Sequence, residues 1–268
     1  MAHVRLQGAR VLLTGASGGL GGAIARALGA RGARLLLSGR REEALRELAR
    51  DLGGQPEVIA ADLASAEDVD RLAGRATGVD VFVASAGLPA SGTLETFTTE
   101  EIDRALAVNL RAPIQLARAL VPAMVERGSG HVVLVSSLAG KVATPGIPIY
   151  AATKFGLRGF ALGLRQDLHG TGVGVTAVFP GFVSGEGMFP ETEARLPRGM
   201  GTSTPEQVAR AVVLGIARDR AEVNVAPTTL RAGALASALS PTLSAAVQRR
   251  LGGREVAERI ARAQAGRR

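Results

Sequence analysis

The one tyrosine of this 268-residue chain stands among residue types that can move a proton. Tyr150 and Lys154 are four residues apart in a helix-patterned segment, which places both side chains on one face. A free phenol has a pKa near 10, and a neighbouring ammonium lowers it by favouring the phenolate. Ser137 lies thirteen residues before the tyrosine, at the end of an apolar run. This spacing predicts a proton-transferring tyrosine beside a hydroxyl that polarises a carbonyl group.

Asn109 adds a fourth polar group, because it interrupts an apolar helical pattern that covers 99–127. We expect it to kink that helix and to hold a water leading to Lys154, which would open a proton path to solvent. A tyrosine near a lysine usually reflects packing alone. The combination with Ser137 and a glycine-rich loop argues against coincidence.

The glycine-rich loop Gly15-Ala-Ser-Gly-Gly-Leu-Gly21 follows the first apolar run. A strand, a glycine turn and a helix start present backbone N–H groups to a phosphate. The spacing differs from the GxGxxG fingerprint, so an ordinary glycine turn is the alternative. Its place directly after the first strand favours a dinucleotide site. The loop residues predicted to bind the cofactor are Gly15, Ser17, Gly18, Gly19, Leu20 and Gly21.

Arg40 and Arg41 follow the second apolar run, where a dinucleotide fold reads the adenosine ribose. A carboxylate at this place favours a free 2′-hydroxyl, whereas two guanidinium groups suit a 2′-phosphate. The pair therefore predicts NADP(H) in preference to NAD(H). The alternative is that both arginines simply face water at the start of a helix.

Two further segments are predicted to contact the cofactor. Asp62 and Leu63 follow the third run and would meet the adenine, with a helix N-cap region as the alternative role. Ala86 and Gly87 follow the fourth run, where small residues let a ligand approach the backbone.

Seven apolar runs alternate with helix-patterned segments along the chain. The runs are 9–15, 33–39, 56–62, 79–85, 130–137, 172–180 and 221–227. The helical segments are 20–31, 41–52, 65–76, 99–127, 150–169 and 205–218. The runs are continuously apolar, as expected for strands buried on both faces of a parallel sheet. The pattern predicts an α/β fold with a doubly wound sheet and right-handed crossovers.

Composition narrows the classes of function. Hydrophobic residues make up 46% of the chain, enough for a substantial core, and the absence of cysteine excludes disulfides and thiolate sites. The net charge of +8 is spread over many segments without interleaved aromatics, which argues against nucleic-acid binding. No apolar stretch suits a membrane span or a signal peptide, so we expect a cytoplasmic protein without an integral membrane segment.

Other chemistry has weaker support. His3, His131 and His169 lack metal-ligand spacing, so we expect structural roles and no metal site. Ser17 sits in a GxSxG pattern typical of hydrolase nucleophiles, but it follows the first strand and lacks an acid and histidine in the required order.

The chain resembles the short-chain dehydrogenase/reductase family. The motifs are TGASGGLG, ASAG, Asn109, the serine pair 136–137, YAATK and PGFVS, over about residues 7–227. The resemblance implies a single Rossmann domain with strand order 3-2-1-4-5-6-7 and a seven-stranded sheet. It implies a catalytic tetrad, in which Ser137 orients the carbonyl, Tyr150 protonates its oxygen, Lys154 holds the ribose and tunes the tyrosine, and Asn109 anchors a relay water. A homodimer or homotetramer is also implied.

The resemblance extends to the nicotinamide end of the cofactor, which Pro180, Gly181 and Val183 would line. The family often places a threonine where this chain has Gly185, and we expect the neighbouring Ser184 to bind the carboxamide instead.

These observations predict one domain over 1–228, with a substrate lid at about 182–204 and a helical extension over 229–268. The leading hypothesis is an NADP(H)-dependent oxidoreductase that reduces a ketone or 3-oxoacyl group. A catalytically idle dinucleotide-binding sensor or assembly protein is the alternative. The expected pocket is formed by 88–97, 138–148 and 182–202, and its apolar residues predict an apolar small-molecule substrate. They are Leu88, Phe97, Leu138, Val142, Ile147, Phe182, Met188 and Phe189. The alternative is that these residues simply pack the lid.

Overall fold

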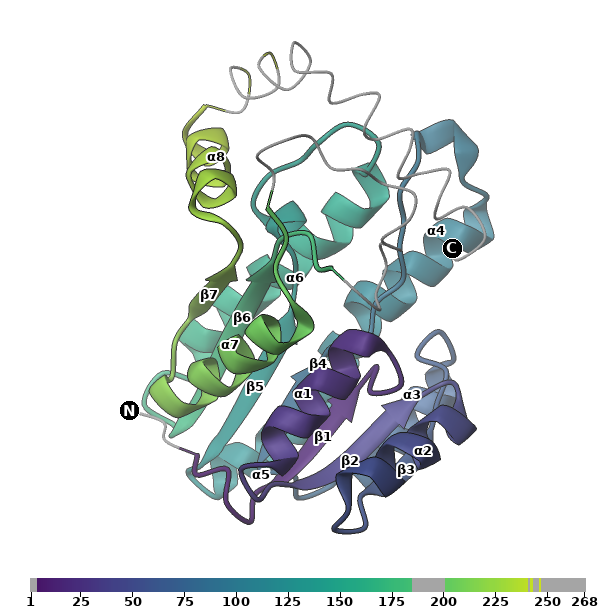
Figure 1. Cartoon of the computed structure of the whole chain (residues 1–268), viewed down its shortest axis with the longest axis vertical. Helices are drawn as coiled ribbons and strands as arrows, with labels where there is room; N and C mark the ends of the chain where they lie inside the picture. Colours follow the sequence, from purple (N-terminus) through teal and green to yellow (C-terminus); the bar gives the residue numbers. More distant parts are fainter. Residues whose placement is uncertain (1–3, 185–200, 241, 243–245, 247–268) are drawn as a thin grey trace.

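The seven apolar runs form one parallel sheet with strand order β3-β2-β1-β4-β5-β6-β7 (Figure 1), which confirms the predicted fold class and topology. The computed structural model describes residues 4–184, 201–240, 242 and 246. The strands are β1 (Arg10–Thr14), β2 (Arg34–Gly39), β3 (Glu57–Ala60), β4 (Val81–Ala84), β5 (Gly130–Val135), β6 (Val173–Pro180) and β7 (Glu222–Val225). Every residue of β4, β5 and β6 is buried, which explains their continuous apolar sequences.

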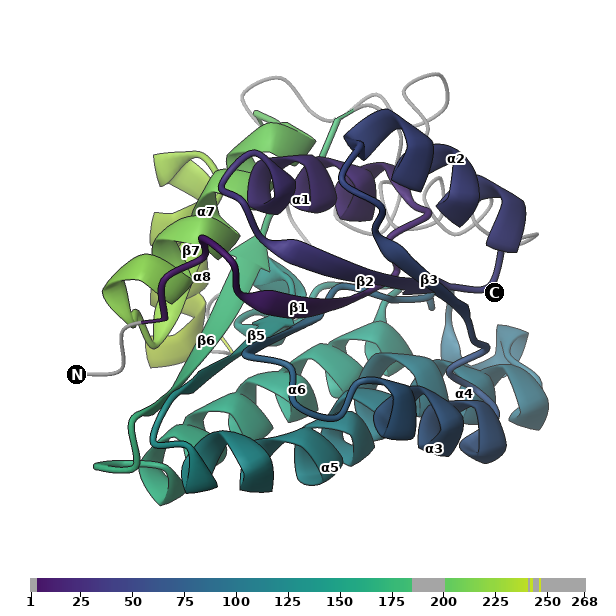
Figure 2. The ribbon, with the colours of Figure 1, turned by 90° about the horizontal axis from the view of Figure 1, so that it is seen from below.

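Helices cover both faces of the sheet (Figure 2). They are α1 (Gly19–Gly29), α2 (Glu42–Leu52), α3 (Ala66–Arg75), α4 (Thr99–Leu106), α5 (Ala112–Glu126), α6 (Pro148–Asp167), α7 (Pro205–Arg218) and α8 (Thr228–Leu239). One core cluster packs α1, α2 and α7 on the sheet, and the other packs α3, α5 and α6. Helices α3, α4 and α7 begin where the local sequence supplies a cap, because Ser65, Thr98 and Thr204 each cap one of them with a side-chain oxygen.

The long helical segment predicted over 99–127 contains a π-helical turn, Ala107–Arg111, between α4 and α5. Asn109 is buried at the middle of this turn. The expected disturbance at Asn109 therefore takes the form of a wider turn, a feature frequent at functional sites.

The segments around β7 bear on the predicted domain division. Ser203 forms a parallel bridge with Val183, so the two ends of the predicted lid lie together. Residues 185–200, with the predicted pocket residues Met188 and Phe189, lie outside the described part of the chain.

Ala234 of α8 belongs to the core cluster under α6. The boundary at 228 stays a prediction.

The described residues offer neither a membrane-spanning helix nor a cluster of metal-ligating side chains. None of their helices is long and apolar enough to cross a membrane. Nor do His, Asp and Glu side chains gather there in a group of three that could hold a metal ion.

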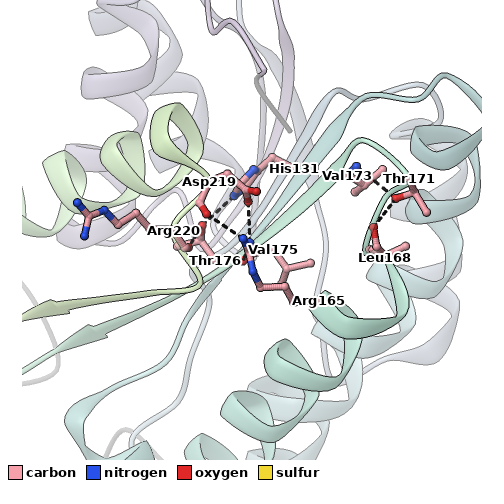
Figure 3. A network of polar contacts seen from close by, with 9 residues as sticks. All are labelled: His131, Arg165, Leu168, Thr171, Val173, Val175, Thr176, Asp219 and Arg220. Atoms are coloured by element: carbon pink, nitrogen blue, oxygen red, sulfur yellow. Dashed lines mark hydrogen bonds and ion pairs between the residues drawn. The ribbon is translucent and has the colours of Figure 1, made fainter. Parts of the chain in front are cut away.

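A buried polar network fastens α6 and the end of α7 to β5 and β6 (Figure 3). Arg165 donates to the Asp219 carboxylate at 2.6 Å and to the carbonyl of Val175 at 2.8 Å. Thr176 donates its hydroxyl to the carbonyl of Arg220, so the 2.8 Å contact with His131 Nε2 requires the ring to donate. Burial lowers the pKa of His131 to about 4, which keeps the ring neutral and structural.

Gly215 provides a stability test, because α7 crosses β6 there at close range. A Cβ at this position would lie 2.5 Å from Cγ2 of Thr176, whose side chain is held by the network. We expect Gly215→Ala to lower the free energy of unfolding by about 1–3 kcal/mol, as overpacking does. Urea denaturation measures the difference.

Gly74→Ala is the matched control, since Gly74 is exposed near the end of α3 and a Cβ there meets nothing within 4 Å. The same substitution should raise the free energy of unfolding there by up to about 1 kcal/mol. Equal effects of both substitutions would contradict the close packing of α7 on β6.

Candidate active site

The first turns of α6 lie directly against the chain that leaves β5. The Ser136 hydroxyl donates to the carbonyl of Lys154 at 3.1 Å. A Cβ on Gly140 would lie 2.6 Å from that carbonyl oxygen, so only glycine allows this approach. The roles of Ser136 and Gly140 were not predicted, although Ser136 belongs to the serine pair at 136–137.

Tyr150 and Ser137 form a hydrogen bond with each other. Ser137 follows β5 directly, and its hydroxyl also accepts from the Ala139 N–H at 3.2 Å, which fixes its direction. Burial raises the pKa of Tyr150 to about 12, and the hydrogen bond with Ser137 opposes that rise. Within the chain itself the direction is therefore opposite to the one expected from the ammonium alone.

Lys154 is the counterpart of the tyrosine, and only 3% of it is exposed. Its Nζ donates to the carbonyl of Val135 at 3.2 Å and lies over the Tyr150 ring, 5.6 Å from the centroid. Burial lowers the pKa of Lys154 to about 8. Lys154 therefore keeps its charge at neutral pH while it lies over the Tyr150 ring.

Asn109 joins the group through the loop that follows β4. Its Oδ1 accepts from the Leu88 N–H at 2.7 Å and its Nδ2 donates to the Leu88 carbonyl at 3.0 Å. A Cβ on Gly87 would lie 3.5 Å from the Asn109 Oδ1 and 3.7 Å from the Lys154 Nζ. The structure thus brings the predicted tetrad together at the carboxyl ends of β4 and β5. The relay water stays a prediction.

The glycine-rich loop is shaped for close backbone approach. Gly15 has a φ of 72°, and a Cβ on it would lie 2.6 Å from Cα of Ala86. A Cβ on Gly21 would meet the Gly15 carbonyl oxygen at 2.1 Å. Helix α1 begins after Gly18 without a capping side chain and without an acid in its first turn. In contrast, α3, α4 and α7 have both, so the amino end of α1 suits an anion.

The predicted adenosine-binding residues lie beside this loop. The Arg41 Nη2 donates to the Ser17 carbonyl at 2.6 Å, and both Arg40 and Arg41 are exposed. Leu63 is buried. Asp62 already accepts from Arg104 at 2.9 Å and from the Ala64 N–H at 3.0 Å. These bonds outweigh burial and lower the pKa of Asp62. An adenine amine that donated to Asp62 would therefore share the carboxylate with Arg104 and the Ala64 N–H.

The hydroxyls of Ser38 and Ser85 are buried without a hydrogen-bond partner among the described residues. Ser38 belongs to β2 and Ser85 follows β4, on either side of the strand that leads into the glycine loop. A buried hydroxyl without a partner is costly, and a polar ligand at this edge would supply one. The carboxyl ends of β2, β1 and β4 therefore fit a dinucleotide.

The end of β6 contributes the predicted nicotinamide-lining residues. Pro180 is the last residue of β6, and the Gly181 N–H donates to the Val225 carbonyl at 2.9 Å. The Ser184 hydroxyl donates to the carbonyl of Ser203 at 3.3 Å. Ser184 is thus engaged within the chain, and its predicted contact with the carboxamide remains a prediction. Gly185 lies outside the described residues.

Comparison with known proteins agrees with this geometry. Residues 9–195 match the short chain dehydrogenase family. The chain belongs to this family. The ketoacyl reductase HetN of Nostoc sp. is 38% identical over 227 residues, which are 82% of this chain and 79% of that protein. The short-chain dehydrogenase described here is thus an oxidoreductase of a family that binds a nicotinamide dinucleotide and acts on small molecules.

Two solved structures extend the comparison. A metagenomic short-chain oxidoreductase in complex with NADP is 35% identical, with a TM-score of 0.70, and the match covers 84% of this chain and 100% of that one. The bulky-bulky ketone specific alcohol dehydrogenase of Comamonas testosteroni is 27% identical, with a TM-score of 0.74, over 88% of this chain and 94% of that one.

The low pKa of Lys154 predicts how stability depends on pH in the absence of cofactor. Between about pH 8 and the ordinary lysine value of 10.5, the unfolded chain keeps a proton that the folded chain has released. Folding stability therefore rises with pH in this window. In Lys154→Met the contribution is absent, so wild type should gain about 2 kcal/mol relative to the variant between pH 7 and pH 10.

Urea unfolding of both proteins at the two pH values, without cofactor, measures this change. The difference between the two proteins removes the titration of every other group. A gap that stays constant with pH would show that Lys154 is not desolvated in the folded chain.

Proposed function

We propose that the protein is an NADP(H)-dependent reductase of ketones, with Tyr150 as the general acid. The observation that carries this proposal is the meeting of Ser137, Tyr150 and Lys154 at the carboxyl end of β5. Ligands bind at this end of the strands in open α/β sheets. The bound cofactor would supply hydride to a carbonyl carbon when reduced and positive charge when oxidised.

The residues of the chain have distinct parts in the proposed reaction. The Ser137 hydroxyl, fixed by the Ala139 N–H, orients the substrate carbonyl next to the phenol. Tyr150 gives its proton to the carbonyl oxygen as the carbon is reduced, so that an alcohol leaves and a phenolate remains. The proton affinity of the phenol, raised by burial, makes it a donor that holds its proton until negative charge develops beside it. Lys154, held on Val135, stabilises the phenolate that forms.

NADP(H) is the proposed cofactor because of the charge around the glycine loop. Arg40 and Arg41 are exposed just after β2, and Arg41 donates to the Ser17 carbonyl of the glycine loop. Two guanidinium groups at this place suit a 2′-phosphate. The solved metagenomic relative in complex with NADP supports the same choice.

An apolar or acyl ketone is the proposed substrate. Leu88 and Leu138 belong to the predicted pocket and to the core cluster beside the site. The Gly92 N–H donates to the Gly146 carbonyl at 2.7 Å, which joins two of the predicted pocket segments. The names of two relatives, a ketoacyl reductase and a bulky-bulky ketone specific dehydrogenase, support bulky ketones.

We also propose that the protein forms a homodimer or homotetramer. The support is a set of exposed large apolar side chains along α4 and α6. They are Leu106, Phe155 and Leu162. Phe155 and Leu162 are seven residues apart, so they share one face of α6.

The proposal predicts turnover of bulky apolar ketones and 3-oxoacyl thioesters with NADPH, at a higher kcat/KM than with NADH. We expect Arg40→Ala and Arg41→Ala each to lower kcat/KM for NADPH by about 10- to 100-fold, because a hydrogen bond to a charged group contributes about 1.5–3 kcal/mol. The value for NADH should change little. Initial rates with both cofactors measure this.

Arg46→Ala is the matched control, because Arg46 lies one turn along α2 and pairs with Glu42 and Glu43 instead. It should leave both cofactors unaffected. A wild-type preference for NADH would overturn the cofactor assignment. Tight NADPH binding without turnover of any ketone would favour the idle dinucleotide-binding protein instead.

A further inference from the structure

Glu222, the first residue of the edge strand β7, binds two cations at once. Its Oε2 accepts from the Lys141 Nζ at 2.7 Å and its Oε1 accepts from the Arg158 Nε at 2.7 Å. Burial disfavours the charge of Glu222, but these two partners outweigh burial and lower its pKa. The carboxylate is thus held ionised between two separate segments of the chain.

Both of those segments carry groups of the proposed active site. Lys141 ends the short 3-10 turn that starts after Ser137, and it is four residues from that serine. Arg158 is four residues beyond Lys154 on α6, so the two side chains lie on one side of the helix. Glu222 therefore connects residues 137–141, called the serine loop below, to α6, which carries Tyr150 and Lys154. Its own strand, β7, carries no residue of the proposed active site.

The Lys141 ammonium is enclosed by its partners, and only 12% of the side chain is exposed. Besides Glu222 it donates to the Asn224 Oδ1 at 2.8 Å, and it lies 4.0 Å from the centroid of the Phe179 ring. Phe179 is buried and immediately precedes Pro180, which we expect to line the nicotinamide. The cluster thus reaches the end of β6 as well.

Lysine at 141 is notable in this sequence, because Lys141 and Lys154 are its only two lysines among 32 basic residues. The compact ammonium donates in three directions, whereas a guanidinium group donates only within its own plane. Arginine at 141 would therefore keep the charge but not the directions of these contacts.

We infer that Glu222 is a positioning residue for the reduction, because it holds the serine loop and α6 in register with the end of β6. The inference rests on the proposed function. Without the carboxylate, two poorly solvated cations would lack their counter-charge and separate. Ser137 would then move relative to Tyr150, and a displacement of about 1 Å can cost 10²-fold in rate. Most of the predicted cofactor contacts should persist, since the glycine loop follows β1 and Arg40 follows β2.

The chain offers a matched control at the opposite edge of the sheet. Glu57 is the first residue of the edge strand β3 and also bridges two cations, Arg10 and Arg75. Its side chain is 34% exposed, compared with 24% for Glu222. Glu57→Gln removes the same chemistry without touching either catalytic segment.

The experiment compares Glu222→Gln, Glu57→Gln and wild type in NADPH-dependent reduction of a bulky ketone. We expect Glu222→Gln to lower kcat by about tenfold or more through misplacement, with the dissociation constant of NADPH unchanged within about twofold. Glu57→Gln should keep kcat within about twofold of wild type. If Glu222→Gln also keeps kcat within about twofold of wild type, the inference is wrong.

A second measurement does not depend on turnover. The chain contains one tyrosine and no tryptophan, so its tyrosine emission reports on Tyr150 alone. We expect acrylamide to quench this emission more strongly in Glu222→Gln than in wild type or Glu57→Gln. If wild type reduces no ketone, the proposed function fails, but the quenching still decides whether Glu222 positions Tyr150. Equal quenching in all three proteins overturns the inference.

Lys141→Arg covers the case in which Glu222→Gln does not fold. It keeps the charge but not the shape of the ammonium contacts. We expect the same loss of kcat and the same rise in quenching, whereas wild-type values in both would contradict the inference.

Discussion

The contact between α6 and the chain leaving β5 is the constraint on which the site depends. The Lys154 carbonyl accepts the Ser136 hydroxyl, while the Nζ of the same lysine donates to the Val135 carbonyl. Gly140 leaves no room for a Cβ between these segments. One residue of α6 is therefore fastened at both its backbone and its side chain to the end of a central buried strand. Tyr150 lies one turn earlier on the same helix, so its position is fixed by the same contacts.

The same burial that fixes the site also sets its proton chemistry. Burial raises the pKa of Tyr150 to about 12 and lowers that of Lys154 to about 8. Each group is thus biased toward its neutral form, since a buried charge is poorly solvated. A phenol with a raised pKa keeps its proton until a more basic oxygen forms beside it. In the proposed reaction such charge develops on the substrate oxygen, next to Ser137 and Tyr150.

Much of the fold was accessible from sequence because its signals are local. A strand buried on both faces is apolar throughout, and a Ser or Thr cap marks a helix start within a few residues. The spacing of Tyr150 and Lys154 likewise fixes a shared helix face. Strand order followed from family resemblance, and the observed sheet confirms it.

The remainder depends on contacts between distant residues. Glu222 is 81 positions from Lys141, and no spacing rule connects them. The tyrosine shows the limit most clearly. Its lysine neighbour suggested a lowered pKa, but the balance is decided by burial, which the sequence around residue 150 does not reveal. The sequence shows Asn109 as a polar residue in an apolar helical pattern. It does not show the π-helical turn around Asn109 or the hydrogen bond between Asn109 and Leu88, which the structure reveals.

The most direct test of the central claim is the kcat of Tyr150→Phe in NADPH-dependent ketone reduction. The variant keeps the ring on which the Lys154 ammonium lies and removes only the hydroxyl. A general acid contributes about 10²- to 10⁴-fold, so kcat should fall by that factor while the dissociation constant of NADPH stays the same. A variant that reduces the ketone at the wild-type rate would show that the proton comes from another group.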